Sequence, residues 1–251
     1  MSLSAENIQS NWKVFLHNIE THISDKKDRK QKLLNFYKKY EERIIMMPAA
    51  HKKEYHGAFP GGYVDHVNRV VRAAIDLNEL WTTFGADMTT YTREELMFSA
   101  INHDLGKMGD ADHEAYIPQT DQWRKDKLGE DYMFNKTLFL LQQHDISYSF
   151  NEMLAIKTHD GLYDVGNEKY LKGFMPEQRP RTSLPFILHQ ADMLAARVEW
   201  EAEWLPKFSQ NSVEKQKKQF NLDANIKSNK TKNKALGGIK SEGLKNMLDN
   251  L

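Results

Sequence analysis

The sequence contains no cysteine, and this absence excludes several classes of protein at once. Disulfide-stabilised domains, cysteine-based zinc fingers, iron–sulfur proteins and enzymes with a thiol nucleophile all require that residue. Any metal bound to this chain must therefore be held by imidazole and carboxylate groups.

The chain also lacks a long apolar run and an excess of charge of either sign. The first residues, MSLSAENIQSNWK, have no apolar core of the kind that a signal peptide needs, and no run approaches the roughly 20 apolar residues of a membrane span. Lysine plus arginine and aspartate plus glutamate number 35 each, so no global field attracts nucleic acid or an anionic membrane. We expect a soluble, cytoplasmic protein without membrane contact.

No internal repeat and no convincing strand pattern is present, so the expected fold class is all-α. Apolar residues at helical spacing over 6–23, and a second helix over 28–47 that Pro48 ends, predict an N-terminal helical hairpin in residues 1–48. We expect this hairpin to pack on a main domain at 49–206. Residues 207–251 are polar and basic, which predicts a partly disordered tail that closes with a short helix over SEGLKNMLDNL.

Local signals place the helices of the main domain. The residues from Thr92 to Glu95 and from Ser149 to Glu152 match capping boxes, so helices should begin there and end near Gly106 and His159. A further helix should begin at Pro185 and end at Pro206. Between the helices lie an expected loop at 49–63 and a long polar insertion at about 109–131.

Three His-Asp dipeptides occur, at 103–104, 144–145 and 159–160, and a single one is weak evidence of function. The order in which they stand is more informative, because His66 lies in an amphipathic helix before them and Asp192 lies in the largely apolar segment HQADMLAARVEW after them. A buried aspartate on such a helix is costly unless it is paired or bound to a cation. A metal site explains His66, His103, Asp104 and Asp192 together.

The segments HDLGK at 103–107, KTHDG at 157–161 and LHQADMLAARVEW at 188–200 follow His66 in an order that resembles the HD-domain superfamily of metal-dependent phosphohydrolases. The resemblance covers about 49–206 and implies a five-helix core. It also implies one or two divalent ions, from Mn, Fe, Zn, Ni, Co or Mg, and a metal-activated water that hydrolyses a phosphoester or phosphoanhydride of a nucleotide. The implied ligands of the first metal are His66, His103, Asp104 and Asp192, and His144 and His159 stand where ligands of a second metal are expected.

The same resemblance assigns residues to the substrate. Asp104 and Lys107 are the expected catalytic residues, with Lys107 facing the phosphate, although a lysine at a helix end also compensates the helix dipole. The segment GAFPGGYVDH resembles the approach to the first histidine in a branch that includes 3′-to-5′ exoribonucleases, and His56 in it is a candidate substrate contact. His189 is expected in a supporting or surface position.

The insertion should overhang the metal and select what enters the site. Its Tyr116, Trp123, Arg124 and Lys125 suit a stacked base and phosphate groups, and Arg124 is the expected substrate-binding residue. Because the chain has no net charge, we expect it to prefer mononucleotides to polymers. Three alternatives stay open: an exonuclease acting on RNA or single-stranded DNA ends, a non-catalytic domain that binds a nucleotide or a protein partner, and a di-iron oxygenase.

Overall fold

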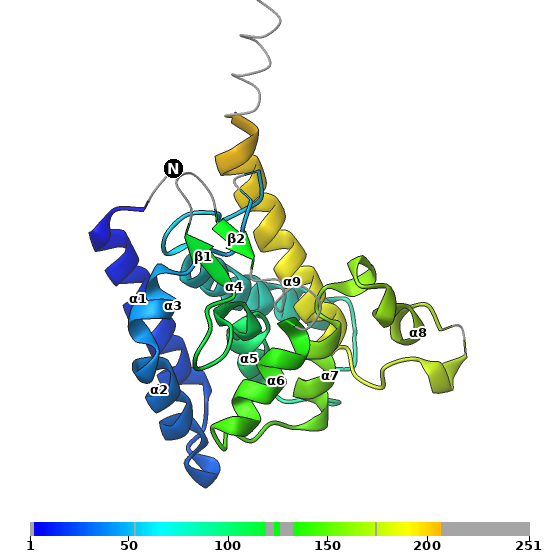
Figure 1. Cartoon of the computed structure of the whole chain (residues 1–251). Coiled ribbons are helices and arrows are strands. Elements are labelled where there is room, and N and C mark those ends of the chain that lie inside the picture. Colours follow the sequence, from blue (N-terminus) through cyan, green and yellow to red (C-terminus); the bar gives the residue numbers. More distant parts are fainter. Residues whose placement is uncertain (1–2, 53, 119–122, 126–132, 174, 207–251) are drawn as a thin grey trace, which may run out of the picture. The chain divides into compact units, whose positions relative to one another are not determined.

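The computed structural model describes residues 3–52, 54–118, 123–125, 133–173 and 175–206. These residues are mainly helical, which confirms the all-α class (Figure 1). The α-helices are α1 (Ala5–His22), α2 (Arg29–Lys39), α3 (Glu41–Met46), α4 (Gly62–Thr83), α5 (Arg93–Asn102), α6 (Met133–Gln143), α7 (Phe150–Thr158), α8 (Glu168–Leu171) and α9 (Leu184–Glu199). None of the helices in the described ranges is long and apolar enough to cross a bilayer.

Short 3-10 turns connect several of these helices. They are η1 (Lys26–Asp28), η2 (Leu105–Met108), η4 (Gly161–Tyr163), η5 (Val165–Asn167) and η6 (Pro176–Gln178), and a π-helical turn, η7, follows α9 at Trp200–Trp204. The chain divides into two units, Met1–Trp204 and Leu205–Leu251. The candidate site lies in the first unit, while the expected tail and its terminal helix at 207–251 lie outside the described residues.

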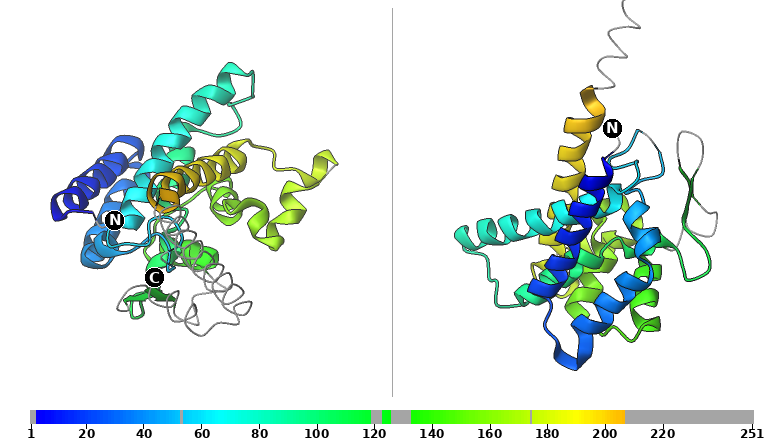
Figure 2. Two further views of the ribbon diagram at one scale, coloured as in Figure 1. Left: turned by 90° about the horizontal axis from the view of Figure 1, so that it is seen from above. Right: turned by 90° about the vertical axis from the view of Figure 1, so that its left-hand side faces the viewer.

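The N-terminal helices pack on the main domain through aromatic side chains. Helix α1 begins at Ser4, whose hydroxyl accepts a hydrogen bond from the Asn7 amide (3.2 Å). Its buried face presents Phe15, whose ring lies 4.7 Å from that of Tyr37 on α2. Helix α1 also contacts α4 and α5, and it packs against α2, beside which it is seen in Figure 1 and in the view from above in Figure 2. The first 48 residues therefore share the core of the main domain.

The helix predicted over 28–47 is wrong in its continuity, because the chain forms two helices there. Tyr40 leaves the helical region of backbone space (φ −109°, ψ 19°) between α2 and α3. Its ring packs 5.1 Å from that of Phe36 in the core. Burial of this aromatic side chain stabilises a bend that helical periodicity alone does not reveal.

Helices α4 and α9 form the most extensive helix pair of the fold. Both helices bury small side chains, namely Ala73 and Ala74 on α4 and Ala191 and Ala195 on α9. Small residues permit a short distance between helix axes. The pair thus carries His66 and Asp192, which belong to these two helices, to the same place in the core.

Helices α5 and α7 begin side by side because their caps are joined. Both predicted capping boxes are confirmed, and Glu95 of the first box also accepts a hydrogen bond from the Ser149 hydroxyl of the second (2.6 Å). His103 stands eleven positions after Thr92, and His159 stands ten positions after Ser149. Since both helices rise by about 1.5 Å per residue, their histidines reach nearly the same level. The His103 and His159 rings lie 5.0 Å apart.

The insertion contains a short antiparallel hairpin, which the sequence did not predict. Strand β1 (Tyr116–Pro118) pairs with β2 (Trp123–Lys125), and Tyr116 stands opposite Lys125. Three residues per strand are too few to establish an alternating pattern. The remaining residues of the insertion from 119 to 122 and from 126 to 131 lie outside the described ranges.

A buried ion pair joins the N-terminal helices to the caps of α5 and α7. The Arg29 guanidinium lies 3.7 Å from the centre of the Phe98 ring, and it pairs with Glu152 (2.6 Å) and Glu94 (3.3 Å). Glu152 is fully buried, and burial raises the pKa of its carboxyl against the opposing effect of Arg29. Removal of the guanidinium would leave a buried carboxylate without its charge partner.

We expect Arg29→Met to lower the free energy of unfolding by about 3 kcal/mol at neutral pH. The loss should shrink as the pH falls toward 5, because the raised pKa lets Glu152 become protonated and uncharged. Urea denaturation at both pH values measures the effect. Arg72→Met, which removes the exposed pair with Asp76, is the control and should have no measurable effect. Equal losses in the two variants at neutral pH would contradict this account.

Candidate metal centre

Three imidazoles and two carboxylates from four helical segments meet in the core. His66 comes from α4, His103 and Asp104 follow α5, His159 follows α7, and Asp192 belongs to α9. The closest approaches are His66 Nε2 to Asp192 Oδ1 (3.1 Å), His103 Nε2 to Asp104 Oδ2 (3.4 Å) and His159 Nε2 to Asp104 Oδ1 (3.5 Å). The structure therefore brings together five of the six residues that the sequence analysis proposed as metal ligands.

The spacing of these atoms suits a cation. One set of donor atoms is offered by His66, His103 and Asp192, another by His103, Asp104 and His159, and within each set all atoms lie within 4.8 Å of one another. Nitrogen and oxygen ligands lie about 2.0–2.2 Å from a divalent transition metal, so ligands of a shared ion are about 4 Å apart or less. The cluster can close on an ion with small side-chain movements.

The histidines direct their Nε2 atoms at the centre of the cluster. Nδ1 of His103 lies 2.8 Å from the Ala100 carbonyl oxygen, and Nδ1 of His159 lies 2.7 Å from that of Ile156. A carbonyl oxygen only accepts, so both Nδ1 atoms carry hydrogen and donate it. In the neutral ring the lone pair then lies on Nε2, which is the arrangement that metal-binding histidines adopt.

Two of these nitrogen atoms lack a hydrogen bond. Nε2 of His66 and Nε2 of His103 are buried and have no hydrogen-bond partner within the described part of the chain, since the approach of His66 to Asp192 does not have hydrogen-bond geometry. Buried polar atoms are nearly always satisfied in folded proteins. A metal ion bound between them would satisfy both.

The two carboxylates are ionised at neutral pH. Burial opposes ionisation, but Lys107 and His103 hold the pKa of Asp104 well below its usual value. Burial also opposes ionisation of Asp192, but the neighbouring His66 and His103 outweigh this effect and lower the pKa of the Asp192 carboxyl. The cluster therefore holds two negative charges in a buried place, and these charges require compensation.

The imidazoles respond to those charges. Burial alone would lower the pKa of His66, but the carboxylates of Glu199 and Asp192 outweigh it and raise that pKa to about 10. Burial opposes the same effect at His159, where Asp104 and Asp160 raise the pKa to about 9. The site attracts positive charge, which protons supply when no metal is bound.

Lys107 lies in η2 and pairs its ammonium with the carboxylate of Asp104. Burial would lower the pKa of Lys107, but Asp104 and Tyr116 raise it above its usual value. The ammonium thus stays charged beside the cluster, and its contact is with a carboxylate, not with the last carbonyls of α5. The contact with a substrate phosphate that was expected of Lys107 stays a prediction.

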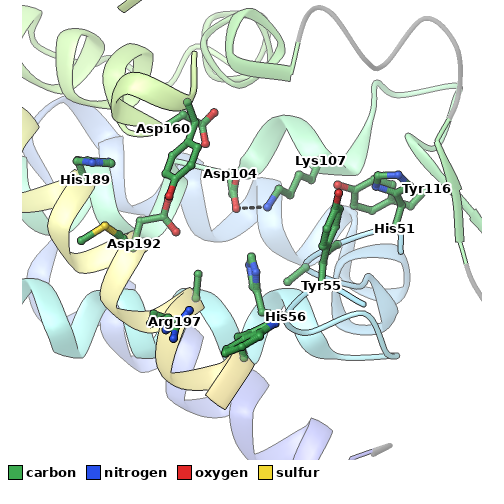
Figure 3. Close-up of a pocket in the computed structure, with 16 residues that line it drawn as sticks. His51, Tyr55, His56, Asp104, Lys107, Tyr116, Asp160, His189, Asp192 and Arg197 are labelled. Carbon is green, nitrogen blue, oxygen red and sulfur yellow. Dashed lines mark hydrogen bonds and ion pairs between the residues drawn. The ribbon is translucent and has the colours of Figure 1, made fainter. Parts of the chain in front are cut away.

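A pocket of about 510 Å³ opens directly onto the cluster (Figure 3). Asp104 and Asp192 line it together with Lys107 and His56. Its volume is typical of sites for small organic ligands. The other lining residues are Ala49, Ala50, His51, Tyr55, Tyr116, Asp160, Tyr163, His189, Met193, Ala196, Arg197 and Trp200.

His56 reaches the pocket because two glycines allow the loop before α4 to fold tightly. The Ala49 amide donates to the Gly57 carbonyl (2.9 Å), and a Cβ atom on Gly62 would lie 2.0 Å from that same carbonyl oxygen. The His56 ring consequently lies 4.9 Å from that of His66. Burial, together with His66 and Lys107, lowers the pKa of His56 to about 4, so this imidazole is neutral at pH 7.

The hairpin of the insertion contributes one described side chain to the pocket. Tyr116 is buried beside Lys107, and burial raises the pKa of its phenol against the opposing effect of that lysine. The backbone of Arg124 lies opposite Ile117 in the hairpin, but the side chains of 123–125 lie outside the described part of the structure. The substrate contact proposed for Arg124 therefore stays a prediction.

The structure does not bring His144 to the cluster. Its ring lies 4.9 Å from that of Phe36 and 5.7 Å from that of Tyr40, and its Nε2 lies 3.4 Å from the Tyr40 hydroxyl. It belongs to none of the groups of potential ligands among the described residues. His144 follows α6, which does not share the joined caps of α5 and α7, and its side chain faces α2. The expectation that it binds a second metal is corrected accordingly.

Three further residues support the site, and two of them had no role predicted from the sequence. Asp160 lines the pocket, and its Oδ1 lies 4.0 Å from Nε2 of His159; burial raises its pKa, against the opposing effect of His159. Glu199 contacts Nδ1 of His66 (3.2 Å). His189 donates from Nδ1 to the His159 carbonyl (2.7 Å), which is the supporting position expected of it. In the sequence, the third His-Asp pair could have indicated Asp160, and the seven-residue spacing from Asp192 could have indicated Glu199.

A scan of the sequence against protein-family models finds no match, and searches of curated proteins and of solved structures find none either. A functional assignment must therefore rest on the site itself.

We expect Gly161→Ala to disturb the site, because Gly161 has a left-handed backbone (φ +58°) and an added Cβ would lie 2.3 Å from Cε1 of His189. Gly85→Ala is the matched control, since Gly85 is also left-handed (φ +83°) but has no atom within 4 Å of the added Cβ. Both variants should lose about 1–2 kcal/mol through the backbone. Only Gly161→Ala should lose more and bind cobalt(II) more weakly. Urea denaturation and cobalt titration measure these effects, and indistinguishable variants would contradict the proposed contact.

Proposed function

We propose that this protein is a metal-dependent phosphohydrolase of the HD-domain type that acts on a nucleotide. The observation that carries the proposal is the convergence of His66, His103, Asp104 and Asp192, in the order expected of that superfamily, beside a pocket that the two aspartates line. A divalent cation bound there would supply Lewis acidity toward a phosphoryl oxygen and would lower the pKa of water. The buried, unsatisfied Nε2 atoms of His66 and His103 support such a cation.

The donor set restricts the metal. Three imidazoles with two carboxylates suit Zn, Fe, Ni, Co or Mn. Magnesium fits least, because it prefers an octahedral shell of oxygen atoms and keeps several waters. We propose two ions per chain, with Asp104 shared by both and His159 among the ligands of the second, since these two residues and His103 form a group of donors within 4.8 Å.

Lys107 is the residue best placed to bind the phosphate. Its ammonium lines the pocket beside Asp104, and its raised pKa keeps it positively charged. A lysine ammonium acts as a compact point charge toward a phosphoryl oxygen. His56 lines the same pocket, and its neutral ring can donate a hydrogen bond to the substrate or accept one from it.

Asp160 is better suited than Asp104 to accept a proton during hydrolysis. The pKa of Asp104 is held low by Lys107 and His103, so that carboxylate is a poor base. The pKa of Asp160 is raised by burial, and its side chain lies in the pocket (Figure 3). A general base works best when its pKa lies closer to the operating pH.

The pocket favours a small phosphorylated substrate with a planar group. Aromatic rings from Tyr55, Tyr116 and Trp200 line it together with the charged Lys107 and Arg197. The absence of net charge on the chain gives little help in holding a long phosphate backbone, so a mononucleotide is preferred to a strand. The presence of all four ligands of the first metal argues against a non-catalytic domain, and metal analysis with an oxygen-dependence assay separates hydrolysis from di-iron oxygenase chemistry.

We expect Asp104→Ala to lose bound metal and to release no phosphate from a panel of nucleotides, because it removes a ligand from both proposed ions. Elemental analysis and a phosphate-release assay measure the two effects, and a labelled single strand at increasing salt is the competing substrate. Full metal content with normal turnover in the variant would refute the assignment. Salt-sensitive shortening of the strand by the native protein, with nucleotides left intact, would instead favour the exonuclease.

The two histidines proposed for a second metal should behave differently. We expect His159→Ala to lower the metal content by about one ion per chain, because His159 lies in the cluster and is a proposed ligand of the second ion. The first site should survive, because His159 is not among its ligands. His144→Ala should retain the native metal content, since its ring contacts Phe36 and Tyr40. Elemental analysis of the purified variants decides the matter. A single ion in the native protein that persists in His159→Ala would rule out the second site.

A further inference from the structure

Glu199 is a buried acid that the proposed chemistry does not use. Its side chain is 1% exposed at the last residue of α9. Its Oε1 lies 3.2 Å from Nδ1 of His66 and 3.8 Å from Nε of Arg69. A carboxylate so deeply buried is costly, and the fold retains it in contact with a ligand of the proposed metal.

The spacing along α9 places two acids around one imidazole. Asp192 and Glu199 are seven residues apart, which is about two turns, so they share one face of the helix. That face packs on α4, where Asp192 Oδ1 lies 3.1 Å from Nε2 of His66 and Glu199 Oε1 lies on the Nδ1 side of the same ring. Each ring nitrogen therefore faces its own carboxylate.

This arrangement fixes the tautomer of His66. The Oε1 atom of Glu199 accepts in this contact, so the hydrogen between the two side chains belongs to Nδ1 of the imidazole. Nε2, which has no hydrogen-bond partner among the described residues, is then the atom that binds metal. A carboxylate behind a metal-binding histidine orients the ring and increases its basicity.

We infer that Glu199 is a positioning residue, which holds His66 with its Nε2 toward the metal by accepting the Nδ1 hydrogen. The inference rests on the proposed metal site and adds a residue outside the expected ligand set. His103 and His159 use backbone carbonyls for the same purpose, and His66, which lies within α4, uses an acid from the neighbouring helix.

Direct binding of a cation by Glu199 is the competing possibility. His56, His66 and Glu199 also offer donor atoms within 4.8 Å of one another. A metal there would require His66 to lose the Nδ1 hydrogen while Nε2 binds the first ion. The hydrogen bond to Glu199 requires no such ionisation, so positioning is the simpler role.

Two variants separate these roles. Glu199→Met approximates the side-chain volume but removes the acceptor, and Glu199→Gln keeps a carbonyl oxygen that can accept from Nδ1. Glu201→Gln, which changes an exposed acid paired with Arg197, is the matched control. Affinity is measured with zinc(II) and cobalt(II) against a chromogenic chelator, and urea denaturation verifies that each variant is folded.

We expect Glu199→Met to bind metal ~10- to 100-fold more weakly, while Glu199→Gln and Glu201→Gln stay close to the native affinity. Equal affinity in Glu199→Met and the control would overturn the inference and leave the proposed function intact. An equal loss in Glu199→Gln and Glu199→Met would replace positioning with direct binding of metal. Absence of metal binding by the native protein would overturn the proposed function as well.

A measurement on the native protein keeps the test independent of variant folding. Nitrogen-15 NMR of the zinc-loaded protein should show the hydrogen of His66 on Nδ1, slow to exchange with water, and the metal on Nε2. Coordination of zinc through Nδ1 would contradict the inference directly.

Discussion

The mutual compensation of charge around Asp104 is the interaction on which this structure depends. Asp104 and Asp192 bring two negative charges into the core, and burial of such charges costs several kcal/mol each unless partners are close. The pKa values of His66 and His159 are raised, so these imidazoles can carry a compensating positive charge, and the ammonium of Lys107 pairs with Asp104. No single helix supplies this set, so the charges balance only when α4, α5, α7 and α9 are assembled.

The helical frame meets that requirement with two simple devices. The packing of α4 on α9, both of which bury alanines, sets His66 against Asp192 and Glu199. Joined capping boxes align the starts of α5 and α7, so that helices of nearly equal length carry His103 and His159 to the same level. Packing and capping thereby determine the geometry of a site that is formed by distant parts of the sequence.

The features that the sequence predicts well are those with local causes. Capping residues and prolines act within one turn of the helix, which is why the starts of α5, α7 and α9 follow from the residues alone. The bend at Tyr40 and the hairpin at Tyr116 depend on burial against distant residues. His144 shows the limit most clearly, because its His-Asp pair is identical in type to the pair at His159 but its helix faces elsewhere. Glu199 lay outside the predicted set because its role exists only across the contact between α4 and α9.

The location of bound metal tests the central claim most directly. Diffraction from crystals of the native protein on both sides of the absorption edge of the metal found by elemental analysis would give its anomalous signal. This account predicts a peak within coordination distance of His66 Nε2, His103 Nε2, Asp104 and Asp192, next to Lys107. An anomalous map without a peak there, with the imidazoles and carboxylates bonded only to one another or to water, would contradict it.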